Sequence, residues 1–242
     1  MSNSKNYQPG DALLIVDVQN DFCPGGALPV QNGNRIVPIV NRWINLANRL
    51  QIPVYASRDW HPNHHPSFVE QGGKWPLHCI QDTKGAMFHP DLELPAGATI
   101  ITKGTRFDHD QNSAFADTGL DVHLKRQGIR RLFICGLALD VCVLDTVMDA
   151  RQNGFEVVLI TDASWPVDPG QASQVVARMQ MAGAVLTESG ALASADGERQ
   201  AKGHVQADSP EEEIEICLKA PEWAEHDRLH DNDMPCDDGR SG

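Results

Sequence analysis

Three polar residues follow predicted buried strands and have the side chains that acyl transfer requires. Asp17 ends the run Ala-Leu-Leu-Ile-Val-Asp, Lys103 ends the run Ile-Ile-Thr-Lys, and Cys142 follows the turn that begins at Gly136. Ligands of an open parallel sheet bind outside the carboxyl ends of its strands, so we expect these side chains to converge. Taken singly, they could be a turn cap, a solvated strand end and a small apolar residue on a helix.

Together, the three side chains offer a thiol nucleophile with a base and a cation. A thiol is a weak nucleophile until it loses its proton, and its pKa falls beside a cation and at a helix N-terminus. Asp140 is predicted to be the N-cap of the helix that carries Cys142, and Lys103 can supply the cation. Asp17 can take the thiol proton and return it to a leaving group. Backbone N–H groups of the turn at 138–142 would then face an oxyanion.

A second group of candidate residues lies on the segment after the second predicted strand. Asp59, His61 and His78 combine a carboxylate with two imidazoles, and either His64 or His65 could add a third. Zinc, iron and manganese prefer such ligands, with open positions left for water or substrate. The alternative is a surface loop that happens to contain histidines. The Trp-Pro-Leu-His-Cys context of His78 favours the metal site.

The elements that must position these residues are strands alternating with helices. Short runs rich in Ile, Val and Leu lack strict alternation, as do strands buried on both faces of a parallel sheet. The predicted strands are 12–17, 53–57, 99–102, 131–135, 156–161 and 184–187. Helical spacing is found at 34–49, 119–128, 140–153 and 170–182, and Gly128, Gly154 and Gly183 can end helices. This order predicts βαβ units and a doubly wound sheet.

The composition changes near residue 195. Residues 196–242 contain fourteen acidic and five basic residues, which predicts an acidic, flexible C-terminal tail. Residues 215–223 are apolar enough to dock locally. The preceding residues 1–195 are predicted to form one domain, in which 59–98 has no clear period and is expected to be a functional loop.

Charge and composition exclude several classes of function. The formal net charge is -13 and Lys and Arg form no stripe, so nucleic acid and anionic membranes are poor partners. The N-terminus lacks the apolar region of a signal peptide, and no run is long enough to span a bilayer. The six cysteines form no CxxC pair. We therefore expect a cytoplasmic protein that acts on a small molecule.

Several short motifs occur in a fixed order between residues 12 and 192. They are Val-Asp-Val-Gln-Asn-Asp-Phe at 16–22, Asp-Trp-His-Pro at 59–62, Trp-Pro-Leu-His-Cys at 75–79, Lys-Gly at 103–104, Ser-Ala-Phe at 113–115 and Gly-Leu-Ala-Leu-Asp-Val-Cys at 136–142. This set resembles the nicotinamidase/pyrazinamidase branch of the isochorismatase-like cysteine hydrolases. The resemblance implies a Rossmann-like, three-layer α/β/α fold with a mostly parallel six-stranded sheet.

The resemblance also implies a reaction. Residues 1–195 would form an isochorismatase-like hydrolase domain that converts nicotinamide, and also pyrazinamide, to the acid and ammonia through a thioester. Asp17, Lys103 and Cys142 would be its catalytic triad. A non-proline cis peptide between Leu137 and Ala138 is implied as well, with backbone N–H groups of Ala138 and Cys142 forming the oxyanion hole.

By the same resemblance, Asp59, His61 and His78 are metal ligands. His65, rather than His64, would add to the metal site, directly or through water. The implied cofactor is one divalent metal ion, with zinc the first choice and iron or manganese the alternatives. His64 is an extra histidine beside the expected ligand position, which leaves the identity of the metal open.

A pocket for a flat aromatic ring is implied around Phe22, Leu28 and Trp75. Ordinary core packing explains these three residues nearly as well. Leu139 departs from the family pattern, in which a small or polar residue is frequent here, so the size of the pocket is left open. The implied partner is a small-molecule amide, and a homo-oligomer is left open.

Two other functions compete with this one. Relatives in the same superfamily hydrolyse carbamoyl or ureido amides with the same triad but generally lack the metal site, whereas isochorismatases lack the cysteine. The second rival is a catalytically silent member that acts as a binding protein. The histidines argue against the first rival, and retention of all three triad residues argues against the second.

Overall fold

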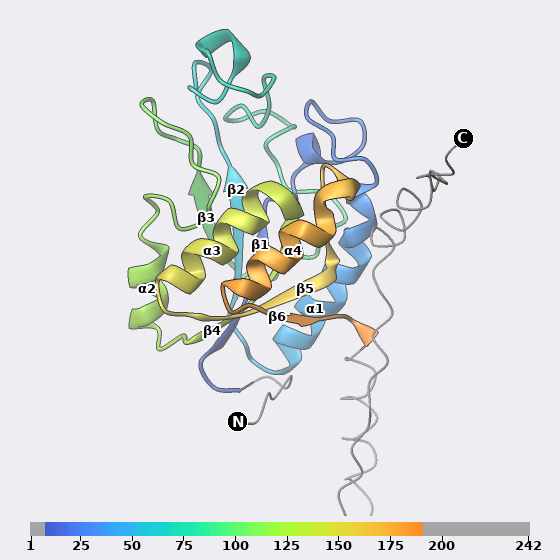
Figure 1. Cartoon of the computed structure of the whole chain (residues 1–242), viewed down its shortest axis with the longest axis vertical. Coiled ribbons are helices and arrows are strands. Elements are labelled where there is room, and N and C mark those ends of the chain that lie inside the picture. Colours follow the sequence, from blue (N-terminus) through green and yellow to red (C-terminus); the bar gives the residue numbers. More distant parts are fainter. Residues whose placement is uncertain (1–7, 191–242) are drawn as a thin grey trace, which may run out of the picture.

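A parallel β-sheet occupies the centre of the computed structural model, which describes residues 8–190 (Figure 1). The sheet has six strands in the order β3-β2-β1-β4-β5-β6, and all neighbouring strands are parallel. They are β1 (Asp11–Val16), β2 (Val54–Asp59), β3 (Thr99–Lys103), β4 (Arg131–Leu137), β5 (Glu156–Trp165) and β6 (Val185–Thr187). The predicted strands are confirmed, whereas the predicted tail at 196–242 lies outside the described residues.

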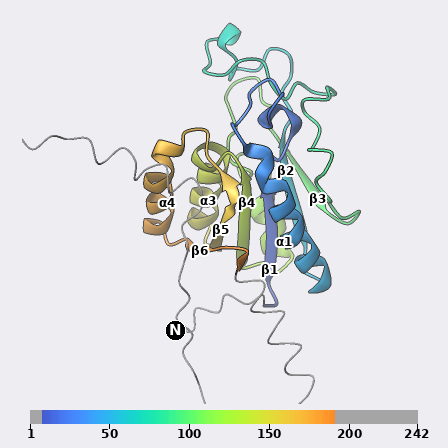
Figure 2. The ribbon, with the colours of Figure 1, turned by 90° about the vertical axis from the view of Figure 1, so that its right-hand side faces the viewer.

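Helices cover both faces of the sheet, which confirms the three-layer α/β/α architecture (Figure 2). They are α1 (Val37–Arg49), α2 (Leu120–Arg126), α3 (Leu144–Gln152) and α4 (Ala172–Met181). The apolar side of α1 packs on one face, and those of α2, α3 and α4 pack on the other. Gly128, Gly154 and Gly183 follow α2, α3 and α4 with φ angles of 72°, 88° and 91°, the left-handed conformation that ends helices.

Strand β1 shows why the apolar runs lack alternation. Leu13 and Ile15 point into the core beneath α1, whereas Ala12, Leu14 and Val16 point into the core beneath the other helices. All five side chains are fully buried. Burial of each Leu, Ile or Val side chain stabilises the fold by about 1.5–3 kcal/mol, so both faces of this strand must be apolar.

The segment at 60–98 joins β2 to β3 and projects beyond the carboxyl ends of the strands, in teal at the top of Figure 1. A short 3-10 turn at Val69–Gln71 is its regular element. Its two ends are tied together, since His61 N donates to Cys79 O (2.8 Å) and Gln81 N donates to His61 O (2.9 Å). Residues near 61 and near 78 therefore lie side by side.

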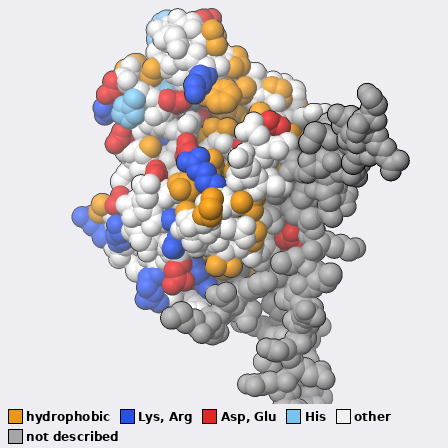
Figure 3. Space-filling view, in the orientation of Figure 1, with side chains coloured by type: hydrophobic (Ala, Val, Ile, Leu, Met, Phe, Trp, Pro, Cys, Tyr) orange, Lys and Arg blue, Asp and Glu red, His pale blue; other side chains and the backbone are white. Residues whose placement is uncertain are grey.

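The surface mixes charges of both signs. Figure 3 shows Lys and Arg side chains interspersed with Asp and Glu side chains over one face of the molecule. Within residues 8–190, no helix has the length and apolar character needed to cross a membrane.

Candidate active site

The candidate site lies where the strand order reverses. β1 and β4 are neighbours at the centre of the sheet, and their connections run to opposite sides. Asp17 follows β1, Cys142 follows β4, and Asp59 and Lys103 end β2 and β3. An open α/β sheet leaves a crevice for ligands at such a point. The structure thus brings the predicted residues together at the carboxyl edge.

Lys103 is at the centre of this group. Its Nζ lies 2.7 Å from Asp17 Oδ2 and 2.6 Å from Asp59 Oδ1. The same nitrogen lies 3.6 Å from Cys142 Sγ. Burial by itself lowers the pKa of Lys103, but the two carboxylates raise it well above its ordinary value. Lys103 is therefore a fully buried cation that is held by two acidic groups.

Asp17 is held so that one of its oxygens faces the thiol. Its Oδ1 accepts a hydrogen bond from Ser57 Oγ (2.6 Å), and its backbone has a φ of 48°, which is uncommon for a residue other than glycine. A carboxylate oxygen of Asp17 lies within 4.8 Å of Cys142 Sγ. Burial raises the pKa of Asp17, which Lys103 opposes. This carboxylate is placed to exchange a proton with the sulfur.

Cys142 lies in a π-helical turn at Leu139–Val143 that leads into α3. Burial raises the pKa of its thiol well above the ordinary value, while Lys103 lowers it and Asp17 raises it further. The prediction of a lowered thiol pKa is therefore wrong, because the cost of burying a thiolate exceeds the attraction of one ammonium. A thiol whose pKa is raised needs a base before it can act as a nucleophile.

Asp140 does not cap the helix, contrary to the sequence prediction. The N-cap residue is Ala138, without a side-chain hydrogen bond. The carboxylate of Asp140 instead accepts hydrogen bonds from Val167 N (2.8 Å) and Asp168 N (2.9 Å). Two backbone donors from the loop after β5 therefore compete successfully for this side chain. The peptide bond between Leu137 and Ala138 is cis, as the family resemblance implied.

Asp59, His61 and His78 form a compact group that suits a metal ion. Each offers one ligand atom, and these atoms lie within 4.8 Å of one another. His61 Nδ1 pairs with Gly104 O (2.8 Å) and His78 Nδ1 pairs with Pro76 O (2.7 Å). Since a carbonyl oxygen can only accept a hydrogen bond, each Nδ1 must carry the proton, and in the neutral ring the lone pair of Nε2 is available to a metal ion. The set of two nitrogens and one carboxylate fits zinc, iron or manganese.

His65 lies beside this group, whereas His64 is exposed. The His65 ring is stacked on His61 with 4.1 Å between ring centroids, and its Nδ1 pairs with Ser67 Oγ (2.7 Å). Its buried Nε2 has no hydrogen-bond partner within the described residues. Burial, followed by the charge of His61, lowers the pKa of His65 to about 4. A neutral imidazole with an unused buried nitrogen fits a ligand role, directly or through water.

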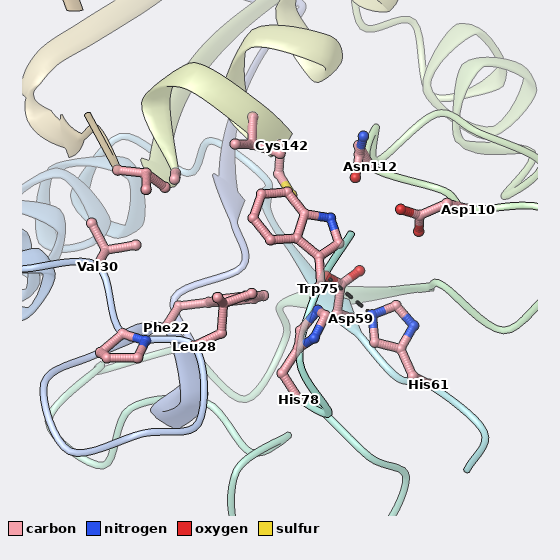
Figure 4. Close-up of a pocket in the computed structure, with 14 residues that line it drawn as sticks. Phe22, Leu28, Val30, Asp59, His61, Trp75, His78, Asp110, Asn112 and Cys142 are labelled. Atoms are coloured by element: carbon pink, nitrogen blue, oxygen red, sulfur yellow. Dashed lines mark ion pairs between the residues drawn. The ribbon is translucent and has the colours of Figure 1, made fainter. Parts of the chain in front are cut away.

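The pocket in front of Cys142 contains the three predicted apolar residues (Figure 4). Phe22, Leu28 and Trp75 line it together with Asp59, His61 and His78, so the thiol and the metal group share one cavity. Sequence reasoning missed six lining residues, which are Pro29, Val30, Asp110, Asn112, Val141 and Val167. Pro29 and Val30 adjoin Leu28, and Val141 adjoins Cys142 within the motif at 136–142. The remaining three have no motif or periodic signal.

Gln19 is another residue whose part in the site was missed. Its Oε1 accepts from Asp59 N and its Nε2 donates to Asp59 O, both at 2.8 Å. The same Nε2 donates to Ala86 O at 2.8 Å, and the side chain is fully buried. Gln19 thus fixes the backbone of Asp59. The sequence signal that could have identified Gln19 is its place in the Val-Asp-Val-Gln-Asn-Asp-Phe motif at 16–22.

The fold and the site define a class of doubly wound α/β proteins in which a buried carboxylate, ammonium and thiol meet at the carboxyl edge of a parallel sheet. The profile of the Isochorismatase domain family matches residues 11–191. A nicotinamidase from Escherichia coli (strain K12) is 40% identical over 201 residues, which cover 74% of this chain and 94% of that protein. The chain belongs to the isochorismatase family.

Solved structures agree with this assignment. The pyrazinamidase of Pyrococcus horikoshii in complex with zinc is 42% identical, with a TM-score of 0.72 over 74% of this chain and 99% of that one. The protein PnC1 from L. infantum in complex with nicotinate is 42% identical, with a TM-score of 0.69 over 75% of this chain and 93% of that one.

Proposed function

We propose that this protein is a nicotinamidase that hydrolyses nicotinamide, and also pyrazinamide, to the carboxylic acid and ammonia. One observation carries the proposal, which is that Cys142 and the metal group of Asp59, His61 and His78 line the same pocket. A thiol alone suits many amides. A thiol beside a metal group and an apolar wall suits an amide on a ring with a metal-binding nitrogen.

Acylation begins with the protonated thiol. Asp17 accepts the proton of Cys142 Sγ as the sulfur attacks the carboxamide carbon, and the carbonyl oxygen becomes an oxyanion. Backbone N–H groups of Ala138 and Cys142 form the oxyanion hole. Lys103 Nζ lies 2.7 Å from Asp17 Oδ2 and stabilises the negative charge of the Asp17 carboxylate. Asp17 then gives its proton to the amide nitrogen, the C–N bond breaks, and ammonia leaves.

Deacylation uses the same residues. Asp17, again a carboxylate, takes a proton from water as the water oxygen attacks the thioester carbon. The C–S bond breaks, the proton returns from Asp17 to Cys142 Sγ, and nicotinic acid is released and loses its remaining proton to solvent as nicotinate. One base therefore serves both half-reactions, which accounts for its placement between the ammonium and the thiol.

The metal ion would be held by Asp59, His61 and His78, with His65 adding its Nε2 directly or through water. A bound ion would act as a Lewis acid toward the ring nitrogen of the substrate. The donor set favours zinc, with iron or manganese as alternatives. Phe22, Leu28 and Trp75 hold the faces and edge of the ring, so that its carboxamide is oriented toward the sulfur.

The four described cysteines are free thiols, which suits a nucleophile that must stay reduced. This supports a location in a reducing compartment such as the cytoplasm.

The deciding experiment measures ammonia release from four amides with metal content determined on the same sample. We expect turnover of nicotinamide and pyrazinamide by protein that contains about one metal ion per chain, and little turnover of N-carbamoylsarcosine or ureidoacrylate. The reverse preference in metal-free protein would identify a carbamoyl or ureido amidohydrolase. Release from none of the four would identify a silent binding member.

A further inference from the structure

The pocket has two chemically different walls. Figure 4 shows Phe22, Leu28 and Val30 on one side, with Asp110 and Asn112 on the other. The proposed mechanism uses the apolar wall to hold the ring but assigns no part to the two polar residues. Both lie on the loop that joins β3 to α2.

The orientation of the Asn112 amide is fixed by its partner. Its Nδ2 donates to Asp145 Oδ2 on α3 at 3.2 Å. Burial raises the pKa of Asp145, and this hydrogen bond lowers it. Because a carboxylate accepts hydrogen bonds and cannot donate them, the NH2 group of Asn112 must face Asp145. Oδ1 therefore points the other way, toward the Asp59 side of the pocket, as Figure 4 shows.

The backbone beside Asn112 is anchored to the site. Gln111 O accepts a hydrogen bond from Lys103 Nζ (3.3 Å). The Gln111 side chain is held at both ends, since Thr105 N donates to its Oε1 (3.1 Å) and its Nε2 donates to Ala116 O (2.6 Å). Asn112 thus follows a residue that is fixed relative to the ammonium. An acceptor held in this way is preorganised and loses little freedom when it binds a ligand.

We propose that Asn112 is a specificity-determining residue whose Oδ1 accepts a hydrogen bond from the carboxamide NH2 of the substrate. This inference rests on the proposed function. A primary carboxamide has two N–H donors, whereas the carboxylate product has none. A fixed acceptor therefore favours the amide, and a carboxylate in the same place would face both the lone pairs of Asn112 Oδ1 and the charge of Asp110. The polar wall thus favours substrate binding and product release.

Binding to metal-loaded Cys142→Ala protein tests this without turnover. Calorimetry gives the Kd of nicotinamide and of nicotinate with and without Asn112→Leu, which keeps the size of the side chain and removes the acceptor. We expect the preference for amide over acid to fall by about three- to tenfold, the usual worth of one net hydrogen bond. Asn153→Leu is the matched control and should leave the preference unchanged, because the Asn153 amide donates to Asp149 O away from the pocket.

A charge exchange gives a prediction of opposite sign. Asn112→Asp combined with Asp145→Asn restores the donor and acceptor pair with the donor on the other residue, and it presents a carboxylate to the pocket. The preference for amide over acid should then rise, because nicotinate meets a full negative charge. An unchanged preference in this double variant would place side chain 112 away from the carboxamide and would overturn the proposal. The double variant also keeps the test valid if Asn112→Leu fails to fold.

The outcomes separate this inference from the proposed function. If the unaltered protein releases no ammonia from nicotinamide, the proposed function fails and this inference fails with it. If it hydrolyses nicotinamide but Asn112→Leu weakens amide and acid equally, and the exchange leaves their ratio unchanged, only the role of Asn112 is overturned.

Discussion

The ammonium of Lys103 lies 2.6 Å from Asp59 Oδ1, so the cation that faces the nucleophile also holds a metal-ligand candidate. The two groups of functional residues are therefore one electrostatic unit. A change in either group alters the charge that the other experiences, since burial leaves little water to screen them.

Cys142→Ala should abolish turnover while the fold persists. The substitution removes the sulfur and leaves the rest of the pocket intact, so ammonia release from nicotinamide should fall by about a thousandfold or more. Cys135→Ala is the matched control, because Cys135 is also buried but lies on β4 outside the pocket. Activity of Cys142→Ala within about tenfold of the unaltered protein would contradict the nucleophile assignment.

Lys103→Met should destabilise the protein as well as inactivate it. The change leaves the buried carboxylates of Asp17 and Asp59 without their cation, which we expect to cost about 3–5 kcal/mol in urea unfolding. Lys125→Met is the control, since Lys125 forms an exposed pair with Asp121 at 3.6 Å that should contribute less than about 0.5 kcal/mol. Equal losses in the free energy of unfolding for the two variants would contradict the assignment of Lys103 as a cation that the buried carboxylates require.

Removal of the metal should stop turnover of nicotinamide without unfolding the chain. Protein stripped with a chelator should lose ammonia release and regain it when zinc, iron or manganese is added. Alkylation of Cys142 should continue in the stripped protein with a changed pH dependence, because the Lys103 ammonium still lies 3.6 Å from the sulfur whereas the charge at Asp59, which also faces the thiol, changes when the metal is removed. Full turnover by protein verified to be free of metal would show that Asp59, His61 and His78 are polar residues of a loop and that turnover does not require a metal ion there.

His65→Ala should weaken zinc binding, whereas His64→Ala should not. His65 is buried with an unused Nε2, and His64 is exposed. Loss of a group that supports a metal site typically weakens binding by about 10–100-fold, so a competition assay with a chromogenic chelator resolves the difference. Equal zinc affinity in the two variants would exclude His65 from the metal site.

Deletion of residues 196–242 should leave the turnover rate per folded molecule nearly unchanged. The proposed catalytic and metal-binding residues lie between Asp17 and Cys142, the pocket lining extends to Val167, and the family match ends at residue 191. The measurement is ammonia release normalised to the fraction of folded protein. Loss of activity in a folded truncated chain would mean that the tail contributes to the site or to an essential interface.

The sequence predicted what depends on local pattern and on the geometry of parallel sheets. Buried strands require apolar side chains on both faces, so their runs were visible, and the ends of those runs marked Asp17 and Lys103. The prediction of βαβ units in a doubly wound sheet rests on the same apolar runs, and the structure confirms it. The convergence of these residues follows from the rule that the carboxyl ends of parallel strands share one edge.

The sequence did not predict what depends on distant neighbours. Asp140 bonds to the backbone of Val167 and Asp168, which only the folded chain brings near. The pKa of Cys142 is set first by burial, and the extent of burial is not a local property. Asn112 lies on a loop without periodic pattern, so only the structure places it in the pocket.

Gln19 joins segments that are far apart along the chain, reaching 40 residues to Asp59 and 67 residues to Ala86. These three hydrogen bonds can form only when the loop after β1, the end of β2 and the long segment have all docked. Assembly of this part of the site therefore requires that all three segments have docked. A partly folded chain carries every ligand and the thiol but holds them apart, so the protein gains its reactivity only with its native topology.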